Sequence, residues 1–204
     1  GCCVPDIKSV EGRAKFGKYE TWYRVSGDLA SKKPPVFILH GGPGAGHNYV
    51  DSYKLLSLQG RAVIHYDQLG CGNSTLLPDK GADFWTVQLF IDELNNLVDH
   101  LKQRAAFHVL GQSWGGMLGA EYGITRPSGL KSLTIANSPA SMELWVHEAN
   151  RLRSEMPQDV QDALNKHEKA GTTDDPDNPA GTMPFHARHV SPAIPFPREM
   201  RATF

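Results

Sequence analysis

The sequence is poor in cysteine, has no excess of charge of either sign and contains no long apolar run. The three cysteines among 204 residues, Cys2, Cys3 and Cys71, form too sparse a set for a disulfide framework, so we expect a reducing, cytoplasmic compartment. The 21 basic and 22 acidic residues give a net charge of −1, which argues against nucleic acid or an anionic membrane as a partner. No apolar stretch approaches the ~18 residues of a membrane span, and no signal-peptide pattern opens the sequence.

Short apolar runs alternate with helical patterns over the first two-thirds of the sequence. We expect a strand at 19–25 and buried strands at 36–40, 62–67, 107–112 and 130–137. Apolar spacing predicts an amphipathic helix over 85–101, and a second helix over 115–125 should end before Pro127. This alternation indicates an α/β fold with a mostly parallel sheet and flanking helices. In such sheets the chemistry gathers at the carboxyl ends of the strands.

The pattern changes after Asn137, where no further run predicts a buried strand. We expect two helices, at 142–156 and 157–169, the second of which is stopped by Gly171. The residues that follow are rich in proline and glycine and predict turns. The sheet should therefore be incomplete on its C-terminal side, with one open edge.

Residues 108–116, HVLGQSWGG, contain the pattern G-x-S-x-G where a predicted strand gives way to a predicted helix. This context is typical of a nucleophile elbow, a tight and strained turn that presents a serine at the edge of the sheet. The residues two before and two after the serine crowd each other in such a turn, and Gly111 and Gly115 meet the need for small side chains. The sequence therefore predicts Ser113 as a catalytic nucleophile.

A glycine-rich segment, His40-Gly41-Gly42-Pro43-Gly44, follows the first buried strand. Acyl transfer needs backbone N–H groups aimed at the developing oxyanion, and glycines allow the bare backbone to approach. We expect the N–H groups of Gly42 and Trp114 to form this oxyanion hole, although the segment alone could be an ordinary Gly-Pro turn. His40 precedes the serine, which favours a structural role for it. Trp114 could wall the substrate pocket or simply pack the elbow.

The loop DQLGCGNS, residues 67–74, is interpreted mainly as structure. Gly70 and Gly72 permit a tight turn, and Asp67 should tie the loop down. Cys71 is more often a small turn residue than a nucleophile, because no base motif accompanies it. Its place beside the elbow nevertheless suggests that bulky thiol reagents would inhibit an active enzyme.

The sequence contains five segments, HGGPGAGHNY, YDQLGCGNS, GQSWGGMLGAEY, ANSPAS and LWVHEANRLRSEMP, that together resemble the proline iminopeptidase family. These are serine aminopeptidases of the α/β-hydrolase fold, and the resemblance runs from about Lys18 to the last residue. It implies an α/β-hydrolase core at 1–140 and the beginning of a helical cap domain at 141–204. The stretch NPAGTMPFHARHV departs from the family, which usually has a smoother helix there.

The resemblance implies release of an N-terminal residue, proline or similar, from peptides, amides or arylamides through an acyl-enzyme at Ser113. The expected substrate is a peptide or an amino-acid amide, and no metal or organic cofactor is implied. Acidic residues of the family's cap hold the substrate's free amine. Glu143, Glu148 and Glu155 could do so here, but solvated helix faces explain them as well. An amidase or esterase of the same fold is an alternative, whereas an epoxide hydrolase would need an acid at position 113.

The acid and the histidine that should follow Ser113 in the chain are not identifiable. The later candidates all lie in the predicted cap and follow no apolar strand: His147, His167, His186, His189, Asp159, Asp162, Asp174, Asp175 and Asp177. A replacement triad such as Asp174 with His186 or His189 has no support from spacing. We therefore expect a fragment of a longer enzyme. The alternatives are one piece of an assembly and a catalytically inactive relative that acts as a binding module.

Overall fold

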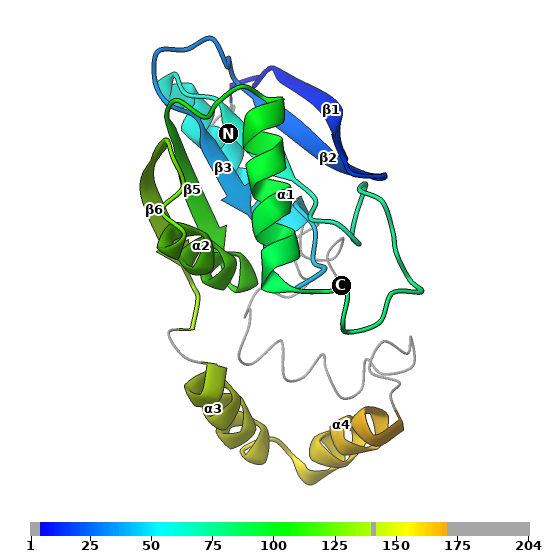
Figure 1. Cartoon of the computed structure of the whole chain (residues 1–204). Coiled ribbons are helices and arrows are strands. Elements are labelled where there is room, and N and C mark those ends of the chain that lie inside the picture. Colours follow the sequence, from blue (N-terminus) through cyan, green and yellow to red (C-terminus); the bar gives the residue numbers. More distant parts are fainter. Residues whose placement is uncertain (1–4, 140–141, 171–204) are drawn as a thin grey trace. The chain divides into compact units, whose positions relative to one another are not determined.

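The computed structural model describes residues 5–139 and 142–170 (Figure 1). The chain divides after Ser138 into two compact units. The first unit holds a sheet with its covering helices, and the second holds the helices α3 and α4. In the described part, no helix combines the length and the apolar character needed to cross a bilayer.

Six strands form one sheet in the order β1-β2-β4-β3-β5-β6. The strands are β1 (Ser9–Phe16), β2 (Tyr19–Ser26), β3 (Val36–Leu39), β4 (Val63–Tyr66), β5 (Phe107–Gln112) and β6 (Leu130–Ala136). Strand β2 runs antiparallel to both β1 and β4, and the three remaining pairings are parallel. Because β3, β4 and β5 are parallel neighbours, the loops that follow them meet at one edge of the sheet.

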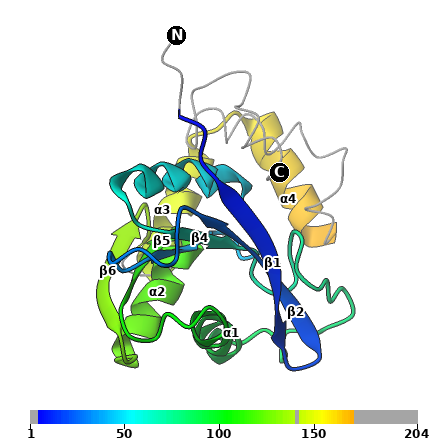
Figure 2. The ribbon, with the colours of Figure 1, turned by 90° about the horizontal axis from the view of Figure 1, so that it is seen from above.

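The sheet of the first unit is covered on both faces (Figure 2). The helices α1 (Val87–His100) and α2 (Trp114–Ile124) contribute to the larger core, together with fully buried side chains of the strands such as Phe37. A run of 3₁₀ turns, η1 (Asn48–Gln59), covers the other face and contributes Val50 to a smaller core. This two-sided cover explains why the central strands are continuous apolar runs in the sequence.

The predicted strands and helices of the first unit are confirmed to within two residues at their ends. Strand β1 and the turns of η1 were not predicted. The residues of β1 are mostly exposed and polar, so its sequence lacks a buried run. The prediction that 130–137 is a buried strand is wrong. Strand β6 does form there, but all of its residues are half-buried or exposed, because among the described strands it lies at the end of the sheet and pairs with β5 alone.

The second unit consists, in its described part, of α3 (Met142–Ser154) and α4 (Gln158–Ala170). Both helices agree with the sequence prediction, and Pro157 directly precedes α4, where its carbonyl accepts the N–H of Val160. Arg151 forms ion pairs with Glu148, which lies in α3, and with Glu155, which directly follows this helix. The predicted turn-rich segment lies outside the described residues, together with Asp174, Asp175, Asp177, His186 and His189.

Candidate active site

Ser113 stands at the turn between β5 and α2, with φ 56° and ψ −122°. This backbone region is costly for a residue that carries a side chain and recurs at functional sites. The Ser113 N–H donates to the carbonyl of Ala136 at 3.1 Å, and its own carbonyl accepts the N–H of Gly116 at 2.9 Å. The partly exposed hydroxyl has no hydrogen-bond partner among the described residues. The turn therefore has the geometry of a nucleophile elbow.

Two glycines make this tight turn possible. A Cβ atom added to Gly111 would lie 2.0 Å from the carbonyl oxygen of Gly115, and one added to Gly115 would lie 2.0 Å from the carbonyl oxygen of Leu39. Both clashes are with backbone, which cannot swing aside as a flexible side chain can. Position 111 therefore needs glycine for the turn itself, and position 115 needs it so that α2 can approach β3.

The glycine-rich loop after β3 runs directly beside Ser113. A Cβ atom on Gly41 would lie 3.1 Å from the Cβ of Ser113. The Gly41 N–H donates to the hydroxyl of Tyr49 at 2.5 Å. Gly42 has φ +116°, which favours glycine, and its N–H bonds to no described residue. As the first residue of α2, Trp114 has an N–H without an intrahelical acceptor.

A buried hydrogen-bond network joins this loop to the indole of Trp114. His40 is fully buried, and its Nε2 accepts the backbone N–H of Gln68 at 2.9 Å. The other ring nitrogen, Nδ1, donates to the Gly41 carbonyl at 2.8 Å. The Gln68 side chain donates to the His40 carbonyl and accepts the Trp114 Nε1–H, each at 3.0 Å. Burial lowers the pKa of His40, so the structural role predicted for this histidine agrees with its surroundings.

A pocket of about 510 Å³ opens beside the elbow. Its lining residues come from the loops after β3 and β4 and from the starts of α1 and α2: Pro43, Gly44, Gln68, Leu69, Gly70, Trp85, Thr86, Val87, Phe90 and Trp114. Ser113 is not a lining residue, but its neighbour Trp114 is. None of the lining side chains carries a charge, and the volume is typical of a small-molecule site.

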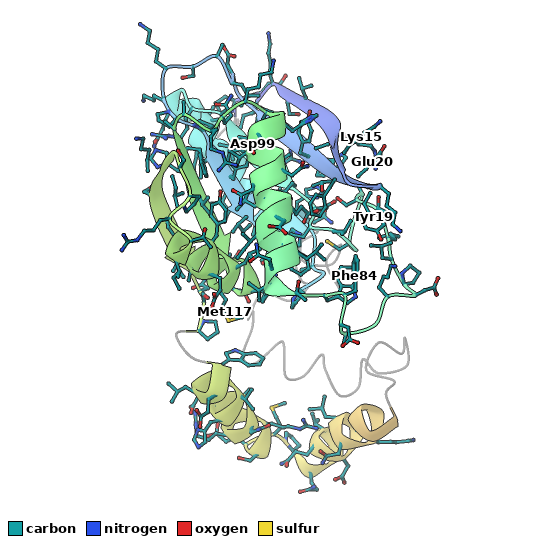
Figure 3. The ribbon with its side chains drawn as sticks, viewed as in Figure 1. Lys15, Tyr19, Glu20, Phe84, Asp99 and Met117 are labelled. Atoms are coloured by element: carbon teal, nitrogen blue, oxygen red, sulfur yellow. The ribbon has the colours of Figure 1, made fainter. Side chains whose placement is uncertain are left out.

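Three aromatic rings contribute to the pocket wall. Trp85 and Phe90 stack at a centroid distance of 6.1 Å, and the Trp114 ring meets Phe90 edge-on at 5.9 Å. Gly70 leaves room for this wall, because a Cβ atom there would lie 2.3 Å from the Trp85 ring. Next to Trp85 in the chain, Phe84 lies against Tyr19 of β2 (Figure 3). The loop that precedes α1 is thus held to the sheet by ring contacts.

Asp67 ties the loops after β3 and β4 together. Its Oδ1 accepts the N–H of His47 at 2.8 Å and bonds to His47 Nδ1 at 2.7 Å, while its Oδ2 accepts the Asn73 N–H at 2.8 Å. Burial opposes ionisation, but these hydrogen bonds hold the pKa of Asp67 below its ordinary value. The predicted anchoring role of Asp67 therefore agrees with the structure.

Cys71 lies in the same loop, with 6% of its surface exposed. Burial raises the pKa of its thiol to about 12, and the charges of Asp67 and Glu93 act in the same direction. A buried thiol that stays protonated is a poor nucleophile. The structure therefore argues against the expectation that bulky thiol reagents would inhibit by reacting with Cys71.

We expect Cys71 to react with iodoacetamide at least about 100-fold more slowly in the native chain than in the denatured chain, because alkylation requires an accessible thiolate. Timed alkylation followed by peptide mass analysis measures this ratio. Equal rates in the two states would contradict the burial of Cys71.

None of the described histidines of the first unit forms a hydrogen bond with Ser113. His40 uses both ring nitrogens in the network, and His47 is paired with Asp67. On the second unit, His147 is exposed and lies 3.9 Å from Glu148. Asp159 and Asp162 of α4 are exposed. The triad acid and base therefore stay unassigned.

The candidate amine ligands on the second unit have ordinary surroundings. Glu143 is exposed, and Glu148 and Glu155 both pair with Arg151. These contacts favour solvated helix faces, the alternative interpretation of these residues.

Sequence reasoning missed three residues that shape the site. Tyr49 and Gln68 hold the loops, and nothing in their local sequence marks them. Glu93 is fully buried on α1, and here a signal existed. It lies three residues after Phe90 and four before Leu97, so a carboxylate stands on the apolar face of the predicted helix.

Residues 34–201 match the family described as the alpha/beta hydrolase fold, and the chain belongs to this family. Its sequence is similar to a proline iminopeptidase of Clostridium botulinum, with 39% identity over 92% of this chain and 64% of that protein. The chain therefore spans about two-thirds of the length of this relative.

The chain is also similar to solved structures, among them the following two. A crystal structure of VinJ has a TM-score of 0.89 and 52% identity, over 96% of this chain and 66% of that one. A proline iminopeptidase structure from Mycobacterium smegmatis has a TM-score of 0.79 and 48% identity, over 95% of this chain and 66% of that one. The resemblance to proline iminopeptidases and the fold class expected from the sequence are confirmed.

Proposed function

We propose that this chain carries the nucleophile, the oxyanion hole and a substrate pocket of a serine aminopeptidase. The enzyme releases an N-terminal residue, proline or similar, from peptides, amides or arylamides. The observation that carries the proposal is the strained Ser113 turn directly beside the glycine-rich loop, next in the chain to Trp114, which lines an uncharged pocket. The similarity to proline iminopeptidases supports the same activity.

In the proposed reaction, the Ser113 Oγ attacks the carbonyl carbon of the first residue and loses its proton to a base that the described residues of the first unit do not supply. The N–H groups of Gly42 and Trp114 donate to the oxygen that becomes negative, and the α2 N-terminus adds a favourable field. As the tetrahedral intermediate collapses, the base returns the proton to the leaving nitrogen, so the amine departs and an ester remains on Ser113. Water then releases the free amino acid.

The pocket lining favours a neutral, apolar first residue. Its main polar groups, the Gln68 amide and the Trp114 indole, are bonded to each other, and Gln68 also bonds to His40. A charged side chain would lose its hydration there without gaining an opposite charge, which costs several kcal/mol.

The resemblance to the family also suggests the domain organisation. We assign residues 1–140 to the α/β-hydrolase core and residues 141–204 to the beginning of a helical cap domain.

The test is hydrolysis of aminoacyl p-nitroanilides by the protein purified from its source. We expect kcat/KM for the prolyl substrate to exceed that for the glutamyl substrate by at least about 100-fold, because the glutamate carboxylate would be desolvated in the pocket. An N-acetylprolyl substrate serves as the control for recognition of the free amine and should react poorly.

Three outcomes would contradict this proposal. Equal rates with and without the acetyl group would indicate a general amidase. Hydrolysis of simple esters alone would indicate an esterase. Tight binding of prolinamide without turnover would indicate a binding module.

A further inference from the structure

Glu93 is a buried charged group that the proposed reaction does not use. It lies on α1 with 0% of its surface exposed. Its Oε2 accepts the hydroxyl of Thr21 at 2.6 Å, and both carboxylate oxygens lie 3.0 Å from the N–H of Leu69. A buried carboxylate is costly unless donors satisfy it, and bonds to an ionised acceptor are strong. The backbone at Leu69 is therefore firmly attached to α1.

The attachment point, Leu69, is itself part of the pocket wall. Gln68 precedes Leu69, and its side chain joins the Trp114 indole to the His40 carbonyl, with 3.0 Å for each bond. Gln68, Leu69 and Trp114 all line the pocket. A continuous path thus runs from the Glu93 carboxylate through the Leu69 backbone and the Gln68 amide to the indole.

We infer that Glu93 is a positioning residue for the pocket wall: it holds the Leu69 N–H and thereby fixes Gln68 and the Trp114 ring. The inference rests on the proposed function only where it takes this pocket as the substrate site. An ionised Glu93 accepts hydrogen bonds through both oxygens, whereas a protonated one turns one oxygen into a donor. The bond to Leu69 then weakens, and the wall shifts with it.

The change in the protonation of Glu93 should occur near neutral pH. Burial raises the pKa of Glu93 to about 7, with Asp67 acting in the same direction, while Thr21 and Leu69 act against them. Glu93 is therefore protonated below this pH and ionised above it. Burial also raises the pKa values of the neighbouring Tyr66 and Cys71, so both stay neutral. Asp67 stays ionised, because its hydrogen bonds keep its pKa low.

The experiment follows the indole N–H resonance of Trp114 in the ¹⁵N-labelled full chain between about pH 5 and 9, without substrate. Trp114→Phe assigns the resonance. We expect it to shift with a midpoint near pH 7, the pKa of Glu93, and to lose this shift in Glu93→Gln. Glu121→Gln is the matched control, since Glu121 is exposed on α2. In this variant the Trp114 resonance should shift with pH as it does in the parent.

Two further variants keep the test decisive if Glu93→Gln does not fold. Thr21→Val removes a donor to the ionised carboxylate, so the midpoint should move upward by about half a pH unit or more. His47→Gln removes the histidine paired with Asp67, and the titration should remain. Three results would overturn the inference. They are a pH-dependent shift of the Trp114 resonance that persists in Glu93→Gln, an unchanged midpoint in Thr21→Val, and loss of the shift in His47→Gln. The NMR readout needs no turnover, so a failed aminopeptidase assay would not affect it. A failed titration would likewise leave the proposed aminopeptidase activity untouched.

Discussion

Replacing Ser113 with alanine should lower kcat/KM for a prolyl arylamide by about 10⁶-fold, the loss typical when a serine hydrolase loses its nucleophile. The reason is local. The Ser113 hydroxyl is the proposed nucleophile, which the strained turn presents beside the glycine-rich loop, and an alanine there cannot form an acyl-enzyme. The residual rate would come from the oxyanion hole and substrate binding alone.

The matched control is Ser132→Ala. Ser132 lies on β6, and its hydroxyl bonds to His108 at 2.6 Å near the opposite end of the sheet. This variant should keep its activity within about two-fold, because surface substitutions away from a site have small effects. A loss below about ten-fold in a folded Ser113→Ala protein would contradict the assignment of the nucleophile, since other groups would then perform the reaction.

Replacing Gly111 with alanine should lower the free energy of unfolding by about 3 kcal/mol or more, which is large for one added methyl group. The new Cβ atom would lie 2.0 Å from the Gly115 carbonyl oxygen. Relief requires movement of the backbone at the elbow, so activity should fall together with stability. Gly115→Ala should behave alike, because its Cβ atom would lie 2.0 Å from the Leu39 carbonyl oxygen.

Urea denaturation of the full chain measures these losses. Gly81→Ala is the matched control, because no atom lies within 4 Å of a Cβ atom at this position. Its free energy of unfolding should stay within about 0.5 kcal/mol of the parent value. If Gly111→Ala were as stable as Gly81→Ala, the elbow geometry described for Ser113 would be wrong.

The parts of the fold that the sequence predicts well are those governed by local patterns. The apolar runs of β3, β4 and β5 and the periodicity of α1 mark buried elements. The burial of β6 could not be predicted in this way. Its residues are apolar enough for an inner strand, but burial depends on whether a further strand lies beside it, which is a property of the whole sheet.

The candidate site likewise combines features that local sequence determines with contacts between distant residues. The G-x-S-x-G pattern predicts the turn at Ser113 because glycines two residues away are a local steric need. The link from Gln68 to Trp114 joins residues that are 46 positions apart. No local pattern encodes that pairing, because the packing of α2 against the loop after β4 creates it. Glu93 falls between these cases, since its position on an apolar helix face marks it as unusual but does not name its partners.

The most direct test of the account is to identify the residue that a fluorophosphonate labels in the purified protein while hydrolysis of a prolyl arylamide is followed. We predict one phosphonyl group on the tryptic peptide that contains Ser113, with labelling and loss of activity in parallel, since the reagent reacts with an activated serine. Complete inhibition with the adduct on another residue, or undiminished hydrolysis after full labelling of Ser113, would contradict the claim that Ser113 is the nucleophile.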